Sequence, residues 1–168
     1  MHIETLRMVI RDFALEDVDD LHEILGDEET MANLEPAYDF EKTQAFLGDF
    51  CIGKGCAYAA ALKGSGKVIG YILLKPLGDA LYEMGWVFNK NYWRQGYAYE
   101  SCKGLLRYAF GQLGAHKVMA ETIDTAKSVH LMEKLGMERE GVQREQTVDR
   151  FGNRADLYQY GILRGEEP

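Results

Sequence analysis

Hydrophobic residues in the first third of the chain change from a period of two to helical spacing. Apolar side chains recur at every second position between residues 6 and 11, which predicts a strand. Residues 18–25 then repeat apolar positions at intervals of three and four, which predicts a helix. The segment from Asp27 to Phe50 is less regular, with Pro36 in a loop and a further helix predicted over residues 40–50. We expect this segment to cover a ligand.

Three β-prone apolar runs follow, over residues 58–63, 67–74 and 81–88. Gly64-Ser65-Gly66 separates the first two runs, and a turn of this composition uses the positive φ that glycine adopts readily. We therefore expect the first two runs to pair as an antiparallel hairpin. The third run is expected to extend the same sheet.

The second half of the chain alternates helix and strand. Apolar positions at helical intervals predict a helix over residues 98–113, with Gly114 at its C-terminal end. A strand at 118–122, a helix at 129–135 that Asp124 or Thr125 can cap, and strands at 138–148 and 157–163 complete the order. With 46% hydrophobic residues, the chain fits a single mixed α+β domain over residues 1–168.

The stretch from Asn91 to Glu100 places small residues where a strand ends and a helix begins. The first backbone N–H groups of a helix have no intrahelical partner and carry the positive end of its dipole. Gly96 and Ala98 leave the approach to these groups open, so this helix start is predicted to bind phosphate. The glycine pattern differs from the G-x-G-x-x-G of a dinucleotide-binding fold.

Charge narrows the choice of partners. A formal net charge of −8 argues against nucleic acid as a ligand and favours a cationic partner. Acidic residues crowd the segment from Glu16 to Glu29, which contains no Lys or Arg, and such a run either attracts an amine or forms a solvated helix face. The histidines show no metal-ligand spacing, so no metal is expected.

Cysteine usage bears on the compartment. The 3 cysteines match no disulfide framework, which favours free thiols in a reducing, cytoplasmic environment. Cys102 falls on the buried stripe of its helix and is expected to pack in the core. The chain opens without a basic apolar leader and contains no apolar run of membrane-spanning length, so we expect no membrane partner.

Two blocks of sequence resemble a known family. Tyr92-Trp93-Arg94-Gln95-Gly96-Tyr97-Ala98-Tyr99-Glu100 resembles the acyl-CoA pyrophosphate loop of the GNAT acetyltransferases, and Thr125 to Met137 resembles the next helix of that family. Glu140-Gly141 and Asp156-Leu157-Tyr158 are similar to its tail, and the resemblance is to the Rim-type branch, which acetylates ribosomal-protein N-termini. It covers about residues 6–163 and implies the GNAT fold, a mostly antiparallel sheet of about six to seven strands flanked by about four helices.

The resemblance also implies which residues hold acetyl-CoA. The strand at 81–88 would splay from its neighbour, so that backbone groups near Trp86, Val87 and Phe88 meet the pantetheine arm. Arg94 adds a cation to the pyrophosphate site or is an ordinary surface residue. At the start of the later helix, Thr125 stands where the family usually has Asn. The implied loop donors are Arg94, Gln95, Gly96, Tyr97, Ala98 and Tyr99, and the later helix adds Thr125 and Ser128.

Acetyl transfer requires a base for the amine and benefits from an acid for the thiolate. Glu83 lies upstream in the 81–88 strand and is the candidate base, with a simple ion pair or a solvent-facing position as the alternative. Many family members use a tyrosine as the acid where this chain has Met132, so Ser128 is the candidate acid unless local backbone groups satisfy its hydroxyl.

Taken together, the sequence predicts an N-acetyltransferase that moves the acetyl group of acetyl-CoA to a primary amine by direct attack in a ternary complex. The acceptor is a protein N-terminus, a polyamine, an amino acid or an antibiotic, and the protein is a monomer or a homodimer. The substitutions at Thr125 and Met132 leave open a different class, a non-catalytic acyl-CoA-binding module.

Overall fold

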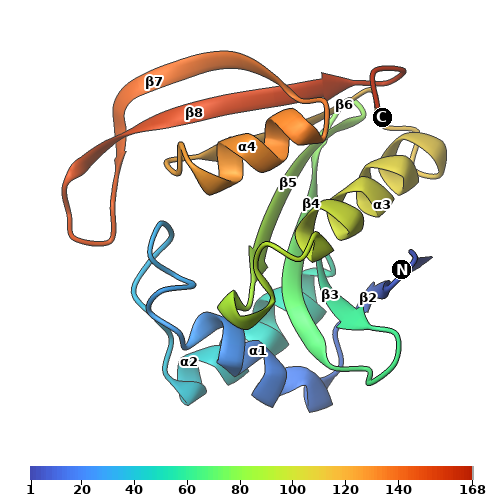
Figure 1. The fold of residues 1–168 in the computed structure, drawn as a ribbon, viewed down its shortest axis with the longest axis vertical. Helices are drawn as coiled ribbons and strands as arrows, with labels where there is room; N and C mark the ends of the chain where they lie inside the picture. The colour runs from blue at the N-terminus through green and yellow to red at the C-terminus, as the bar shows by residue number, and fades with distance from the viewer. Residues whose placement is uncertain (168) are drawn as a thin grey trace.

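A computed structural model describes residues 1–167 of the chain, which form a mixed sheet with helices on both faces (Figure 1). The 8 strands lie in the order β1-β2-β3-β4-β5-β6-β8-β7. Neighbouring strands are antiparallel except β5 and β6, which are parallel. The strands are β1 (His2–Glu4), β2 (Met8–Asp12), β3 (Ala57–Leu62), β4 (Val68–Gly78), β5 (Leu81–Phe88), β6 (Lys117–Thr122), β7 (Glu138–Val148) and β8 (Arg154–Leu163).

Two pairs of helices cover the sheet. Helices α1 (Val18–Leu25) and α2 (Phe40–Ala45), the latter continued by a π-helical segment (Phe46–Ile52), share one buried cluster with the sheet. Helices α3 (Tyr97–Gly111) and α4 (Lys127–Lys134) share a second, larger cluster. Short 3-10 turns at Leu15–Asp17 and Lys90–Tyr92 precede α1 and α3. The predicted mixed α+β class is therefore confirmed.

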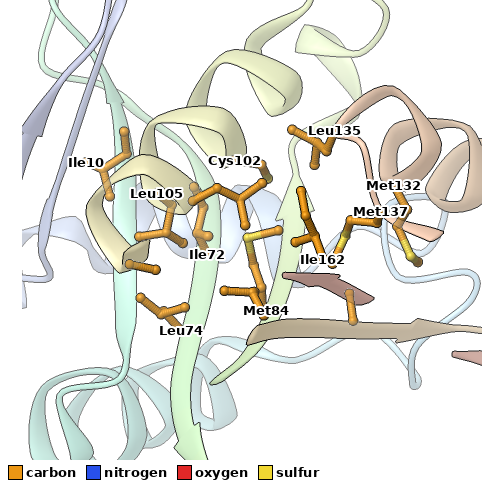
Figure 2. Close-up of a cluster of buried hydrophobic side chains, with 14 of the residues drawn as sticks. Ile10, Ile72, Leu74, Met84, Cys102, Leu105, Met132, Leu135, Met137 and Ile162 are labelled. Carbon is orange, nitrogen blue, oxygen red and sulfur yellow. The ribbon is translucent and has the colours of Figure 1, made fainter. Parts of the chain in front are cut away.

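The larger cluster joins α3 and α4 to the sheet. Cys102, Leu105, Met132 and Leu135 are fully buried, and Figure 2 shows them in one cluster with strand residues. Burial raises the pKa of the Cys102 thiol, which keeps it protonated and confirms its expected place in the core. The helix that begins at the proposed phosphate loop is thus fixed to the sheet by packing along its length.

The periodic segments of the sequence match the observed elements, with two differences. Strand β1 was not expected, because three residues are too few to show an alternating pattern. It raises the strand count above the expected six to seven. The helix expected over residues 40–50 changes at Phe46 from α-helical to π-helical geometry. Gly66 adopts φ +74° in the predicted hairpin turn between β3 and β4.

The sheet opens between its two parallel strands. Strand β5 pairs with β6 only at Leu81, Tyr82 and Glu83. The last pair joins Glu83 to Met119. Beyond this point β5 stays paired with β4 as far as Phe88, while β6 stays paired with β8. The two strands therefore separate after Glu83, and the splay that the family resemblance implied is present.

Candidate active site

A cleft of about 620 Å³ lies where β5 and β6 separate. Its walls come from the end of β5, the loop before α3, and the first turns of α3 and α4. One side is closed by the segment between α1 and α2, through Glu29, Thr30, Asn33 and Leu34. The sequence led us to expect that the segment from Asp27 to Phe50 covers a ligand, but it did not single out these four residues, because an irregular loop carries no periodic signal that places its side chains.

The loop before α3 presents a row of free backbone donors to this cleft. Within residues 1–167, the backbone N–H groups from Arg94 to Tyr99 have no protein hydrogen-bond partner, and the first helical bond runs from Glu100 N to Gly96 O. Arg94 and Gly96 both adopt left-handed conformations, with φ +60° and +83°. Turns of this kind gather successive N–H groups into a concave anion site. The predicted phosphate-binding helix start therefore has the required geometry.

The loop is anchored where it leaves β5. Trp93 donates from Nε1 to the backbone oxygen of Phe88 at 2.6 Å, which fixes the loop to the end of β5. The Asn89 side chain accepts a hydrogen bond from Asn91 N at 3.0 Å and shapes the preceding turn. Gly96 is required by its backbone conformation, and a Cβ there would lie 3.3 Å from Arg7 Nη2. Its role therefore differs from the open approach that the sequence suggested.

Cationic side chains line part of the cleft, although the protein as a whole is acidic. Lys127 Nζ lies 3.9 Å from the Trp93 ring centroid, and Lys134 Nζ lies 4.6 Å from that of Tyr99. Both lysines line the cleft together with Arg94. The two lysines were missed in the sequence, although their spacing of seven residues places them on one face of α4. The cleft is thus suited to an anionic ligand.

Most of the residues predicted to bind acetyl-CoA line this cleft, but two do not. Gln95 lies outside the lining, and its side chain turns back to donate to the Asn91 backbone oxygen at 3.2 Å. Thr125 lies outside the lining, where Asp124 is found instead, accepting hydrogen bonds from Ala126 N and Lys127 N. The predicted residues in the lining are Trp86, Val87, Phe88, Arg94, Gly96, Tyr97, Ala98, Tyr99 and Ser128.

Ser128 and Met132 lie one turn apart on α4 but face different surroundings. Ser128 is half-buried in the cleft wall, and within residues 1–167 its hydroxyl has no protein hydrogen-bond partner. The alternative of a serine satisfied by local backbone groups is therefore not observed. Met132 is fully buried in the core and does not reach the cleft.

Glu83 lies at the last pair of β5 and β6, where the opening begins. Its carboxylate pairs with Lys75 Nζ at 3.3 Å, the alternative that the sequence had left open. It lines a separate hollow of about 180 Å³ with Glu121 and Glu140. Partial desolvation, with the nearby Glu83 carboxylate, raises the pKa of Glu121. The structure therefore does not bring Glu83 into the cleft that contains Ser128.

Much of the acidic run is neutralised within the fold. Asp17 pairs with Arg11, and Asp20 and Glu23 share Lys67. Lys90 pairs with Asp27 at 2.6 Å and holds the segment that closes the cleft. Arg150, at the tip of the β7–β8 hairpin, donates to Glu28 O at 2.7 Å, and Figure 1 shows this tip beside that segment. The run is therefore largely structural, and Glu29 is its contribution to the cleft lining.

None of the helices within residues 1–167 is long and apolar enough to cross a membrane. Over the same residues, His, Cys, Asp and Glu side chains do not gather in groups of three that could hold a metal ion. The cysteines Cys51, Cys56 and Cys102 are free and buried.

Comparisons with known proteins agree with this geometry. The sequence profile of the Acetyltransferase (GNAT) domain matches residues 7–138. The chain is 32% identical over 169 residues to an uncharacterized N-acetyltransferase, YnaD, of Bacillus subtilis (strain 168), covering 99% of each protein. Its structure resembles a GNAT-family acetyltransferase from Bacillus anthracis, with a TM-score of 0.89 at 29% identity, covering 99% of this chain and 100% of the other.

A more distant relative shares the fold. Spermidine N-acetyltransferase from Vibrio cholerae, solved in complex with CoA and spermine, aligns with a TM-score of 0.81 at 19% identity over 95% of this chain and 97% of its own. The profile match spans most of the chain, from β2 to the start of β7. The chain therefore belongs to the GNAT family of acetyltransferases.

Proposed function

We propose that the protein transfers the acetyl group of acetyl-CoA to a primary amine by direct attack within a ternary complex. The observation that carries this proposal is the row of backbone N–H groups from Arg94 to Tyr99, which have no protein partner within residues 1–167. They lie at the cleft where β5 and β6 separate. A pyrophosphate needs such convergent donors, and Lys127 and Lys134 add positive charge beside them. The distant relative solved with CoA supports the choice of ligand.

The splay offers an N–H group to the acyl carbonyl. Asn89 N donates to Ile69 O at 2.9 Å. From there, β5 pairs with β4 in one continuous register as far as the pair of Tyr82 with Pro76. In an antiparallel ladder, alternate residues direct their N–H groups toward the partner strand, so Trp86 directs its N–H away from β4. Trp86 also lies beyond the last β5 residue that pairs with β6. We infer that Trp86 N–H stabilises the negative charge that develops on the carbonyl oxygen.

Ser128 is the proposed donor to the departing thiolate. Its hydroxyl lines the cleft without a protein partner in the described chain, so it is available to a ligand. A thiol with a pKa of about 8.5 leaves without full protonation, so this contribution is expected to be modest. The buried Met132 cannot take the role.

Glu83 remains the proposed base, acting through water from the separate hollow that it lines. An N-terminal amine has a pKa of about 8 and a lysine-like amine about 10, so either must lose a proton before it attacks. Glu83 lies on the strand that carries the proposed oxyanion donor, at the point where β5 and β6 separate. The adjacent Glu121 and Glu140 make this hollow acidic, which suits a cationic acceptor.

A thiol-release assay tests the proposal. The protein is mixed with acetyl-CoA and, in turn, with peptides bearing free N-termini, polyamines, amino acids and aminoglycosides, and free CoA is measured. Release that depends on both protein and amine is the expected result. The Gly96→Val variant should lose CoA binding and serves as the control for contaminating activity, because a β-branched residue is strongly disfavoured at φ +83°.

Calorimetric titration with CoA distinguishes a protein that binds CoA without turnover from one that does not bind CoA. Micromolar binding without turnover on any amine would overturn the enzyme proposal in favour of the acyl-CoA-binding module. A wild-type protein that fails to bind CoA at all would overturn both.

A further inference from the structure

Arg7 contacts the proposed anion-binding loop, residues 94–99, from outside the cleft. It lies in the turn between β1 and β2, and its Nη1 donates to the backbone oxygen of Gln95 at 3.0 Å. Its guanidinium carbon lies 4.2 Å from the centroid of the Tyr97 ring, a cation–π contact. Arg7 Nη2 would also be the nearest neighbour of a Cβ at Gly96. Arg7 therefore braces the loop at successive residues.

The orientation of Arg7 is fixed in turn by Glu100 in the first turn of α3. One Glu100 carboxylate oxygen accepts from Arg7 Nε at 2.7 Å. The other accepts from Arg7 N and from Thr5 Oγ1, each at 2.6 Å. Burial alone would raise the pKa of Glu100, but these hydrogen bonds from Thr5 and Arg7 hold it below its usual value. An ionised Glu100 thus ties the β1–β2 turn to the start of α3.

The contact with Gln95 sets the direction of a donor in the anion site. In a planar trans peptide the C=O and the following N–H point in opposite directions. Because the Gln95 carbonyl points at Arg7, the Gly96 N–H must point away from Arg7. Gly96 lines the cleft, and its N–H is one of the unpartnered donors there. Arg7 thereby selects the orientation of the Gln95–Gly96 peptide in which this N–H is available to an anion.

Arg7 also offsets a negative charge near the anion site. The Glu100 side chain is only 16% exposed, so little solvent screens its charge. Without the Arg7 guanidinium this carboxylate would lose its ion-pair partner, and it lies in the first turn of α3 next to the proposed pyrophosphate donors at residues 94–99. Both effects of losing Arg7, the freed peptide and the uncompensated charge, weaken anion binding.

We propose that Arg7, held by Glu100, is a positioning residue for the acyl-CoA donor, setting the affinity for CoA without touching it. This inference rests on the proposed function of the cleft. We expect Arg7 to affect donor binding alone, because it lies outside the cleft lining, in the turn between β1 and β2, and the strands β3 and β4 separate this turn from β5.

Calorimetry with CoA on Arg7→Gln tests the inference. Loss of a charge-assisted hydrogen bond to the loop predicts a Kd raised about tenfold or more. Arg7→Lys keeps the positive charge but cannot bridge Glu100 and Gln95 with a rigid fork, so its Kd should fall between those of wild type and Arg7→Gln. The matched control is Arg11→Gln, on the following strand, where Arg11 pairs with Asp17 at 2.7 and 2.8 Å but does not contact the loop.

The control is expected to lower the melting temperature and leave the Kd for CoA unchanged. In turnover assays, Arg7→Gln should raise KM for acetyl-CoA while kcat at saturation stays near the wild-type value. An unchanged Kd in Arg7→Gln would overturn the inference, as would equal weakening in Arg11→Gln. If Arg7→Gln does not fold, Arg7→Lys decides, and a wild-type Kd there overturns the inference. Wild-type protein that does not bind CoA overturns the proposed function itself.

Discussion

Replacing Gly96 with alanine perturbs the proposed anion-binding loop by a single methyl group. Gly96 has φ +83°, a left-handed conformation that costs an L-residue about 1–2 kcal/mol. The added Cβ would also lie 3.3 Å from Arg7 Nη2, so the exposed end of that side chain must give way. The chain can avoid the strain by rotating the adjacent peptides, which turns their N–H groups away from the cleft. We expect the Kd for CoA to rise about tenfold or more, since each 1.4 kcal/mol is a factor of ten.

Gly152 provides a matched control for the same substitution. It has φ +84° in the turn between β7 and β8, and a Cβ there would meet nothing within 4 Å. Gly152→Ala should therefore lose a similar amount of stability, about 1–2 kcal/mol in denaturant unfolding, with no change in CoA affinity. Calorimetric titration with CoA measures the affinity of both variants. Wild-type affinity in Gly96→Ala, or equal weakening in both, would refute the assignment of the loop.

Three further predictions concern the buried Leu105, the ion-paired Glu100 and the proposed base Glu83. Leu105→Ala removes a fully buried side chain and should lower the free energy of unfolding by about 2–5 kcal/mol in urea melts; a loss under 1 kcal/mol would contradict the packing described. The lowered pKa of Glu100 means that its stabilisation is fully present above its usual value of 4.5 and is lost as pH falls through the folded-state pKa. Melting curves of wild type and Glu100→Gln should therefore converge at acid pH, and a constant gap would exclude the effect. Glu83→Gln should cut turnover about a hundredfold, most strongly at low pH where the amine is protonated, with CoA affinity intact. Glu140→Gln, which removes the partner of Lys117 in the same hollow, is its control, and an unchanged pH–rate profile in Glu83→Gln would remove Glu83 from the mechanism.

The sequence predicted those parts of the fold that depend on neighbours along the chain. Alternation and helical spacing located most strands and the helices α1, α3 and α4, because burial of one face imposes those periods, whereas α2 lies in a segment with a weaker pattern. Gly96 and Ala98 pointed to the start of α3, where the N–H groups have no protein partner within residues 1–167, since a helix start exposes its donors whatever the tertiary context. The separation of β5 from β6 was predicted from the family resemblance and not from any periodic pattern.

The predictions that depended on distant parts of the chain were less complete. Asp124, rather than Thr125, lines the cleft, and only the turn before α4 determines which of the two faces inward. The contact between Arg7 and Glu100 joins residues 93 positions apart, and neither residue stands out in its own segment. Sequence spacing cannot reveal such pairs, because the register of packing between α3 and the first strands sets them.

The short pairing of β5 with β6 divides the sheet into two blocks of strands joined by the residues from Leu81 to Glu83. A ligand that fills the opening bridges the two blocks and binds only the folded chain. Such a ligand stabilises the fold by about 2.7 kcal/mol when its concentration is a hundred times its Kd. If acetyl-CoA is that ligand, the melting temperature of the protein depends on the acetyl-CoA concentration, and the two blocks of strands unfold less readily when the opening is filled.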